Sequence, residues 1–160
     1  MERKPIATSD LVSISSHVHY ELDMMFFAAS TYLNFSGSEK RLADMALESF
    51  VLHFRVIYDF FYKKRHRPDD VVACDFFATD DEWPTIRREP SEILRTSRAR
   101  ADKELAHLTY VRLIRTYDEK HWQVAAIAQE LHVIMSTFLE SVTKDNMATE
   151  WENVPALVLT

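Results

Sequence analysis

Glycine, cysteine and long apolar runs are all scarce in this sequence, and each shortage excludes a class of protein. A single glycine among 160 residues leaves no glycine-rich loop of the kind that binds phosphate in P-loop and dinucleotide-binding folds. It also argues against all-β folds, which need glycine in many turns. The single cysteine, Cys74, excludes an internal disulfide and a cysteine-based zinc site. We expect Cys74 to be a small buried side chain.

An excess of basic residues is also missing. The formal net charge of −6 argues against a general nucleic-acid coat protein, whose affinity comes from neutralising many phosphates. No apolar segment follows the basic N-terminus, and no stretch is long and apolar enough to span a bilayer. The sequence therefore predicts a cytoplasmic protein with no membrane partner, and its composition predicts no cofactor.

Apolar residues at helical spacing fill most of the chain. They predict helices over about residues 14–32, 39–62, 91–115 and 116–144. The signals at their ends are Gly37 after the first helix, Ser91 as the N-cap of the third, and a Thr116/Glu119 capping box for the fourth. We expect one all-α domain over residues 1–160, a four-helix up-down bundle with its core at about 14–144 and a tail at 145–160.

The long connection at residues 63–90 is predicted to be ordered. Loops of this length usually cover or bind something, and Phe76, Phe77 and Trp83 would anchor it over one end of the bundle. Residues 69–73 read as a short helix capped by an aspartate, Asp69 or Asp70.

Residues 93–110 concentrate the most suggestive chemistry. Read as one uninterrupted helix, this stretch places Leu94, Ala101, Leu105 and Leu108 in an apolar stripe. Its polar flank holds Arg100, Lys103, Glu104 and His107. Arg100 and His107 are two helical turns apart, so their side chains point the same way and can converge on one anion.

Further basic residues lie on either side of the long connection. They are Lys63, Lys64, Arg65, Arg67, Arg95 and Arg98. Two interpretations stay open: an ordinary solvated surface, or a local phosphate-binding patch on an acidic body. Arg98 is also an alternative to Arg100 as the functional arginine, because a shift of two residues moves the side chain to another face.

The spacing Arg100, six residues, His107 resembles the motif of the HEPN superfamily, which consists of small all-α domains. The resemblance differs at the residue after the arginine, where members often carry a polar side chain and this chain has Ala101. It implies a dimeric, metal-independent endoribonuclease or RNA-binding domain, of the kind found in toxin–antitoxin and phage-defence systems, with RNA and an antitoxin as partners. His107 would then move a proton and Arg100 would stabilise negative charge at phosphorus, with Lys103, Glu104 and Arg98 in support.

Two alternatives to a ribonuclease stay open. The first is a non-catalytic homodimeric interaction module, in which Glu104 pairs with Arg100 or His107 and the broad apolar surface of residues 50–62 binds a second subunit. In that helix we expect His53 to be a hydrogen-bonded core or interface histidine.

The second alternative is a ferritin-like di-metal bundle, suggested by the Glu-x-x-His run from Glu104 to His107. Such a site needs that pattern on two helices, and Glu130 and His132 point to opposite sides of theirs. Glu48 and His53 lie on another helix, and His17 with Glu21 reads as a surface pair. We therefore predict no metal site.

Overall fold

The described chain is built from helices. The computed structural model describes residues 6–64, 67, 69–104, 110–114, 116 and 121–158, and within these ranges there is no strand. The α-helices are α1 Thr8–Leu33, α2 Lys40–Tyr62, α3 Glu82–Ile86, α4 Glu92–Glu104, α5 Val111–Ile114 and α7 Val124–Ser141. The short 3₁₀ helices are η1 Ala73–Phe76, η2 Lys144–Asn146 and η3 Thr149–Glu152. The predicted all-α class is confirmed for the described residues.

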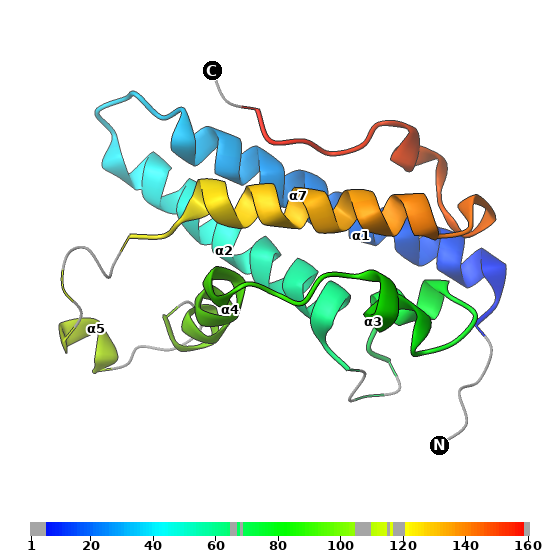
Figure 1. Cartoon of the computed structure of the whole chain (residues 1–160). Coiled ribbons are helices and arrows are strands. Elements are labelled where there is room, and N and C mark those ends of the chain that lie inside the picture. The colour runs from blue at the N-terminus through cyan, green and yellow to red at the C-terminus, as the bar shows by residue number, and fades with distance from the viewer. Residues whose placement is uncertain are drawn as a thin grey trace.

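Helices α1 and α2 form the largest interface and fold back on each other as a hairpin (Figure 1). Helix α1 begins at Thr8, earlier than the predicted residue 14, because Leu11 and Ser15 extend its buried stripe. It ends at Leu33, within one residue of the predicted end, with Asn34 as its C-cap, and Gly37 does not adopt a positive φ. The prediction that this glycine ends the helix is therefore wrong. Helix α2 agrees with the predicted range of residues 39–62 within one residue.

The connection after α2 covers one end of the molecule, as predicted. Trp83, Phe76 and Phe77 are buried, and the ring of each packs against Phe138 of α7. The Trp83 indole N–H also donates to the Phe61 carbonyl at 2.8 Å. These contacts bury the aromatic rings and satisfy the indole donor at the same time.

The predicted short helix at residues 69–73 is wrong. The helical turn in this part of the connection is η1, which starts at Ala73. The Asp75 carboxylate accepts the Val72 N–H at 3.0 Å, so the capping carboxylate is supplied by Asp75 instead of either predicted aspartate. Cys74 is only partly buried, which corrects the expectation of a fully buried thiol.

The third predicted helix is not one uninterrupted helix. Ser91 does cap it, because the Leu94 N–H donates to the Ser91 hydroxyl at 3.2 Å. The described part of α4 reaches Glu104, residues 105–109 lie outside the described residues, and Tyr110 is in a turn before α5. In Figure 1, α5 lies away from the long helices, and the side chains of Tyr110, Leu113 and Ile114 are all exposed. Leu94 and Ala101 of the predicted apolar stripe are buried, and its other two members, Leu105 and Leu108, lie outside the described residues.

The fourth predicted helix starts too early. Thr116 is not helical, and α7 begins at Val124 after a non-helical stretch that includes His121 and Trp122. The predicted partner Glu119 lies outside the described residues. Helix α7 crosses α1 and α2 (Figure 1) and buries the apolar stripe that the sequence predicts. It ends at Ser141, and Lys144 belongs to η2.

The C-terminal tail docks on the body of the same chain. The Trp151 indole N–H donates to the Ser15 carbonyl at 3.0 Å, and its ring packs edge-on against His19. Farther along, the Val158 N–H donates to the Ser30 hydroxyl at 2.9 Å. The tail therefore runs along α1 (Figure 1). Among the helices of the described ranges, none has the length and apolar character needed to cross a membrane.

Candidate functional site

Arg100 is held at the last turn of α4 by three contacts. Its Nε donates to Oε2 of Glu104 at 2.7 Å, and its Nη1 donates to the His121 carbonyl at 2.9 Å. The guanidinium carbon lies 4.1 Å from the centre of the Trp122 ring. Only 12% of the Arg100 side chain and 14% of the Glu104 side chain are exposed. A stacked, charge-paired arginine in such a site has little freedom to move.

Helical spacing explains the Arg100–Glu104 pair, whereas the contacts of Arg100 with His121 and Trp122 depend on how the chain folds. Residues four apart lie on one face of a helix, so the carboxylate reaches the guanidinium within α4. The segment before α7 then brings His121 and Trp122 against the same guanidinium. The expected pairing of Glu104 with Arg100 is confirmed, whereas the homodimeric module to which that pairing belonged stays a prediction. Lys103, on the same predicted flank, is exposed.

His107 lies outside the described residues. The predicted convergence of Arg100 and His107 on one anion therefore stays a prediction. The same holds for Arg65, which also lies outside these residues.

Arg98 points to a different part of the molecule from Arg100. Its Nε and Nη2 donate to the two carboxylate oxygens of Asp59 on α2, at 2.8 and 2.9 Å. A second carboxylate, that of Asp102, pairs with its Nη1. The hydrogen bond with Asp59 is the main reason why the pKa of Arg98 is raised above its usual value. Arg98 therefore joins α4 to α2, and only 13% of its side chain is exposed.

The other basic residues of the predicted patch are more exposed. Lys63 Nζ lies 3.7 Å from Asp59, and the Arg95 guanidinium pairs with Glu92 at 3.0 Å. About half of the Lys63 side chain and half of the Arg95 side chain are exposed. Lys64 and Arg67 are exposed. Ion pairs this exposed are weak and exchange readily with other anions, so these side chains fit the solvated-surface interpretation and still allow contact with phosphate.

Some of the carboxylates and histidines considered for a metal site have other partners, and Glu21 pairs with His53 of α2 instead of forming the predicted surface pair with His17. His53 is buried, and its Nδ1 lies 2.6 Å from Oε2 of Glu21, which confirms the expectation of a hydrogen-bonded histidine. Glu130 accepts from the Ser91 hydroxyl at 2.6 Å and from its N–H at 3.0 Å. Within the described ranges, no group of three or more histidine, cysteine, aspartate or glutamate side chains has the arrangement to hold a metal ion.

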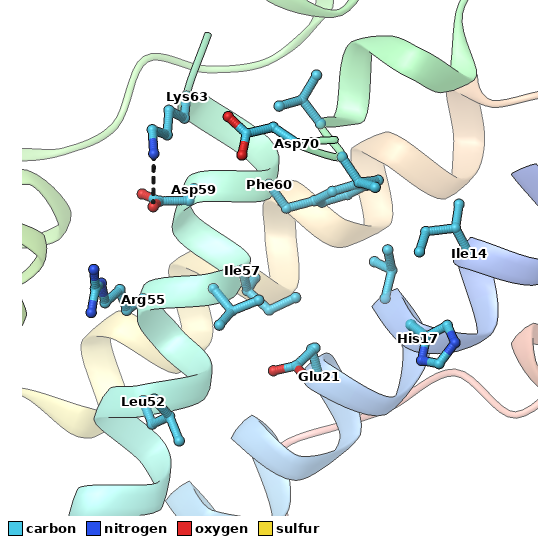
Figure 2. Close-up of a pocket in the computed structure, with 14 residues that line it drawn as sticks. Ile14, His17, Glu21, Leu52, Arg55, Ile57, Asp59, Phe60, Lys63 and Asp70 are labelled. Carbon is cyan, nitrogen blue, oxygen red and sulfur yellow. Dashed lines mark ion pairs between the residues drawn. The ribbon is translucent and has the colours of Figure 1, made fainter. Parts of the chain in front are cut away.

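A groove of about 430 Å³ lies between α1, α2 and the segment at residues 70–72. Figure 2 shows Leu52, Arg55, Asp59 and Lys63 along α2 and His17 and Glu21 on α1, with Arg55 and Asp59 on the side of α2 away from α1. Arg55 pairs with Asp102 of α4 at 3.0 Å. Sequence reasoning missed this groove, although the alternation of Arg55, Asp59 and Lys63 at intervals of four residues is a visible signal of a charged helix edge.

No family model, curated protein or solved structure matches this chain.

Proposed function

We propose that this chain is a HEPN-like domain that binds and cleaves RNA without a metal ion, with Arg100 and His107 as its catalytic residues. The observation that carries the proposal is the fixed position of the Arg100 guanidinium, between Glu104, the His121 carbonyl and the Trp122 ring. A cation that is already oriented stabilises developing negative charge without reorganising during the reaction. His107 follows Glu104 by three residues, which is close enough in sequence to act on the same phosphate.

The proposed reaction needs one proton acceptor and one fixed cation. The neutral His107 imidazole takes the proton from a ribose 2′-hydroxyl, since histidine titrates near neutral pH. The 2′-oxygen then forms a bond to phosphorus, and Arg100 stabilises the negative charge of the phosphorane. The bond from phosphorus to the 5′-oxygen breaks, and this oxygen takes up a proton from solvent. The products are a 2′,3′-cyclic phosphate and a 5′-hydroxyl, and DNA is not a substrate because it has no 2′-hydroxyl.

Several surrounding elements complete the proposal. Lys103, Lys63, Lys64, Arg65, Arg67 and Arg95 would contact the RNA backbone, and Arg98 would support the position of α4. The pairing of Arg98 with Asp59 and of Arg55 with Asp102 ties α4 to α2. This supports the arrangement of α1, α2, α4 and α7 as a four-helix up-down bundle. By its resemblance, the domain would act in the cytoplasm as a toxin or defence component with an antitoxin partner.

RNA cleavage in EDTA tests the proposal. A mixed RNA pool is incubated with the wild type, with His107→Ala and with His17→Ala, which changes an exposed histidine on α1. We expect cleavage by the wild type and by His17→Ala, and a loss of about 100-fold or more in His107→Ala, as is usual when a general base is removed. The proposal fails if the folded wild type leaves the RNA intact, or if both histidine variants cleave equally well.

A second candidate function is a non-catalytic homodimeric interaction module. The observation in its favour is that carboxylates already form ion pairs with two arginines of α4. Arg100 pairs with Glu104, and Arg98 pairs with Asp59. If this function is correct, the wild type does not cleave RNA, and His107→Ala self-associates as well as the wild type does. The same set of variants, examined by sedimentation as well as cleavage, separates the two functions.

A further inference from the structure

The hairpin of α1 and α2 has an outer face, on the side away from α7, that carries large exposed apolar side chains. Figure 1 shows α7 in front of the hairpin, and Figure 2 views the hairpin from the other side, with Leu52 toward the viewer. The outer face consists of Tyr20 and Phe27 on α1 and Met45, Leu52 and Val56 on α2. Their exposed fractions are 54%, 65%, 64%, 48% and 42%.

These residues form two parallel stripes. Met45, Leu52 and Val56 repeat at intervals of seven and four residues, and Tyr20 and Phe27 are seven apart, so each set lies along one side of its helix. The two stripes lie side by side on the hairpin, because the centre of the Tyr20 ring lies 6.1 Å from that of His53, the residue next to Leu52. Leu52 and Val56 also line the groove that includes His17 and Glu21 of α1, so polar side chains border the apolar stripes there.

The size of this surface is close to that of a protein–protein interface. Ordinary side-chain areas of about 150–250 Å², scaled by the exposed fractions above, give about 500 Å² for one copy. Two copies facing each other would bury about 1,000 Å² before any polar rim is counted, which is the lower limit for a specific interface. The largest apolar patch on a typical monomer is about 300–600 Å², and a patch of this size is often functional.

The charges along α2 indicate which partner fits. Glu48 and Arg55 are both on the flank of the stripe and are seven residues apart, so they lie on the same side of the helix. In an antiparallel pair of α2 helices, Glu48 of one copy therefore lies beside Arg55 of the other, and the reverse pair forms by symmetry. Arg55 is 38% exposed despite its pair with Asp102, and among the described residues Glu48 has no ion-pair partner.

The apolar and charged patterns share one centre. The midpoint between Met45 and Val56 and the midpoint between Glu48 and Arg55 are one residue apart along α2. A single two-fold axis there pairs Met45 with Val56 of the other copy and Glu48 with its Arg55. Self-complementarity of this kind is what a two-fold symmetric interface requires.

From these observations we propose that the outer face is a homodimer interface, in which a second copy of this chain packs with its α2 antiparallel to the first and its α1 against the other α1. The two hairpins then form an intermolecular four-helix layer that buries the outer face and closes the groove. This proposal uses neither Arg100 nor His107, so it holds or fails independently of RNA cleavage.

Sedimentation of the full chain at increasing concentration tests the proposal. We expect the wild type to approach twice the 18.8 kDa of one chain. Leu52→Glu should sediment as a monomer with unchanged helical circular dichroism. The matched control is Val133→Glu, which places the same charge on an exposed position of α7 (41% exposed) and should remain dimeric. A wild type that stays monomeric at high concentration, or a Leu52→Glu variant that dimerises as well as Val133→Glu does, would overturn the proposal.

Two further variants test the antiparallel arrangement. Glu48→Lys puts two like charges beside each other and should raise the dimer dissociation constant at least tenfold, whereas Glu140→Lys, the same change at an exposed position of α7, should not. Leu52→Cys lies near the two-fold axis and should be cross-linked between copies by a short bismaleimide, while Val133→Cys should cross-link no more than the wild type. Equal effects of the paired variants would contradict this interface.

Discussion

Replacing Arg98 with alanine should destabilise the protein, because this side chain is the main polar link between α4 and α2. Arg98 donates to both carboxylate oxygens of Asp59 and pairs with Asp102, with 13% of its side chain exposed. Removing it leaves the Asp59 carboxylate, itself only 28% exposed, with Lys63 at 3.7 Å. Exposed ion pairs contribute up to about 1 kcal/mol, whereas breaking a fully buried one costs about 3–5 kcal/mol. For this half-buried pair we expect a loss of about 2–3 kcal/mol in the free energy of unfolding.

Urea denaturation followed by circular dichroism measures this loss. Arg95→Ala is the matched control, because Arg95 is also on α4 and pairs with Glu92, but half of its side chain is exposed. We expect the control to lose less than about 1 kcal/mol. A double-mutant cycle with Asp59→Ala should give a coupling energy well above zero, since the two side chains are in direct contact. Equal losses in Arg98→Ala and Arg95→Ala would refute the anchoring role of Arg98.

Three other predictions concern the core, the tail and the response to alkaline pH. Phe138→Ala should lower the free energy of unfolding by about 3–5 kcal/mol, since Phe138 is at the centre of the aromatic cluster that includes Trp83, Phe76 and Phe77; calorimetry checks this, and a loss below about 1 kcal/mol would contradict the packing. Trp151→Ala should free the C-terminal tail, because the indole holds it to Ser15; limited proteolysis should then cut after Ala148 faster than in the wild type, and an unchanged rate would show that Trp151 does not hold the tail. Burial raises the pKa of Tyr62 above the ordinary tyrosine value of about 10, so the folded state holds the phenol proton more tightly than the unfolded state. Stability from this group is complete below pH 10 and falls as the pH rises above it. The fall should be smaller in Tyr62→Phe, as measured by denaturation at a series of alkaline pH values, and an identical fall in both proteins would contradict this origin.

The helices could be predicted from the sequence where an apolar stripe has a surface to pack against. Helix α2 is right within one residue because its buried positions repeat without interruption from Ala46 to Phe61. The predicted helix over residues 91–115 is interrupted at Tyr110, beyond which Leu113 and Ile114 are exposed, because periodicity alone does not say whether apolar side chains have a surface to pack against. Likewise, the capping pattern at Thr116 predicts a helix start, but the contacts of His121 and Trp122 with Arg100 hold part of this segment in another conformation.

The candidate site could be predicted only in its local part. The Arg100–Glu104 pair follows from an interval of four residues within one helix. The contacts of Arg100 with Trp122, and of Arg98 with Asp59, join residues that are far apart in the sequence, so no spacing rule reveals them. The same applies to His53, whose burial could be expected from the apolar helix around it, but whose partner Glu21 lies on another helix.

The most direct test of the proposed reaction is to remove the 2′-hydroxyl of one ribose in the RNA and to measure cleavage at that nucleotide. An RNA oligonucleotide that the wild type cleaves in EDTA is compared with the same oligonucleotide carrying a 2′-deoxyribose at the nucleotide before the cleaved bond. The proposed chemistry predicts a 2′,3′-cyclic phosphate on the RNA product and no cleavage at the deoxyribose, because the nucleophile has been removed. Cleavage at the deoxyribose, or a product without the cyclic phosphate, would contradict a reaction in which His107 activates the 2′-hydroxyl and Arg100 stabilises the phosphorane.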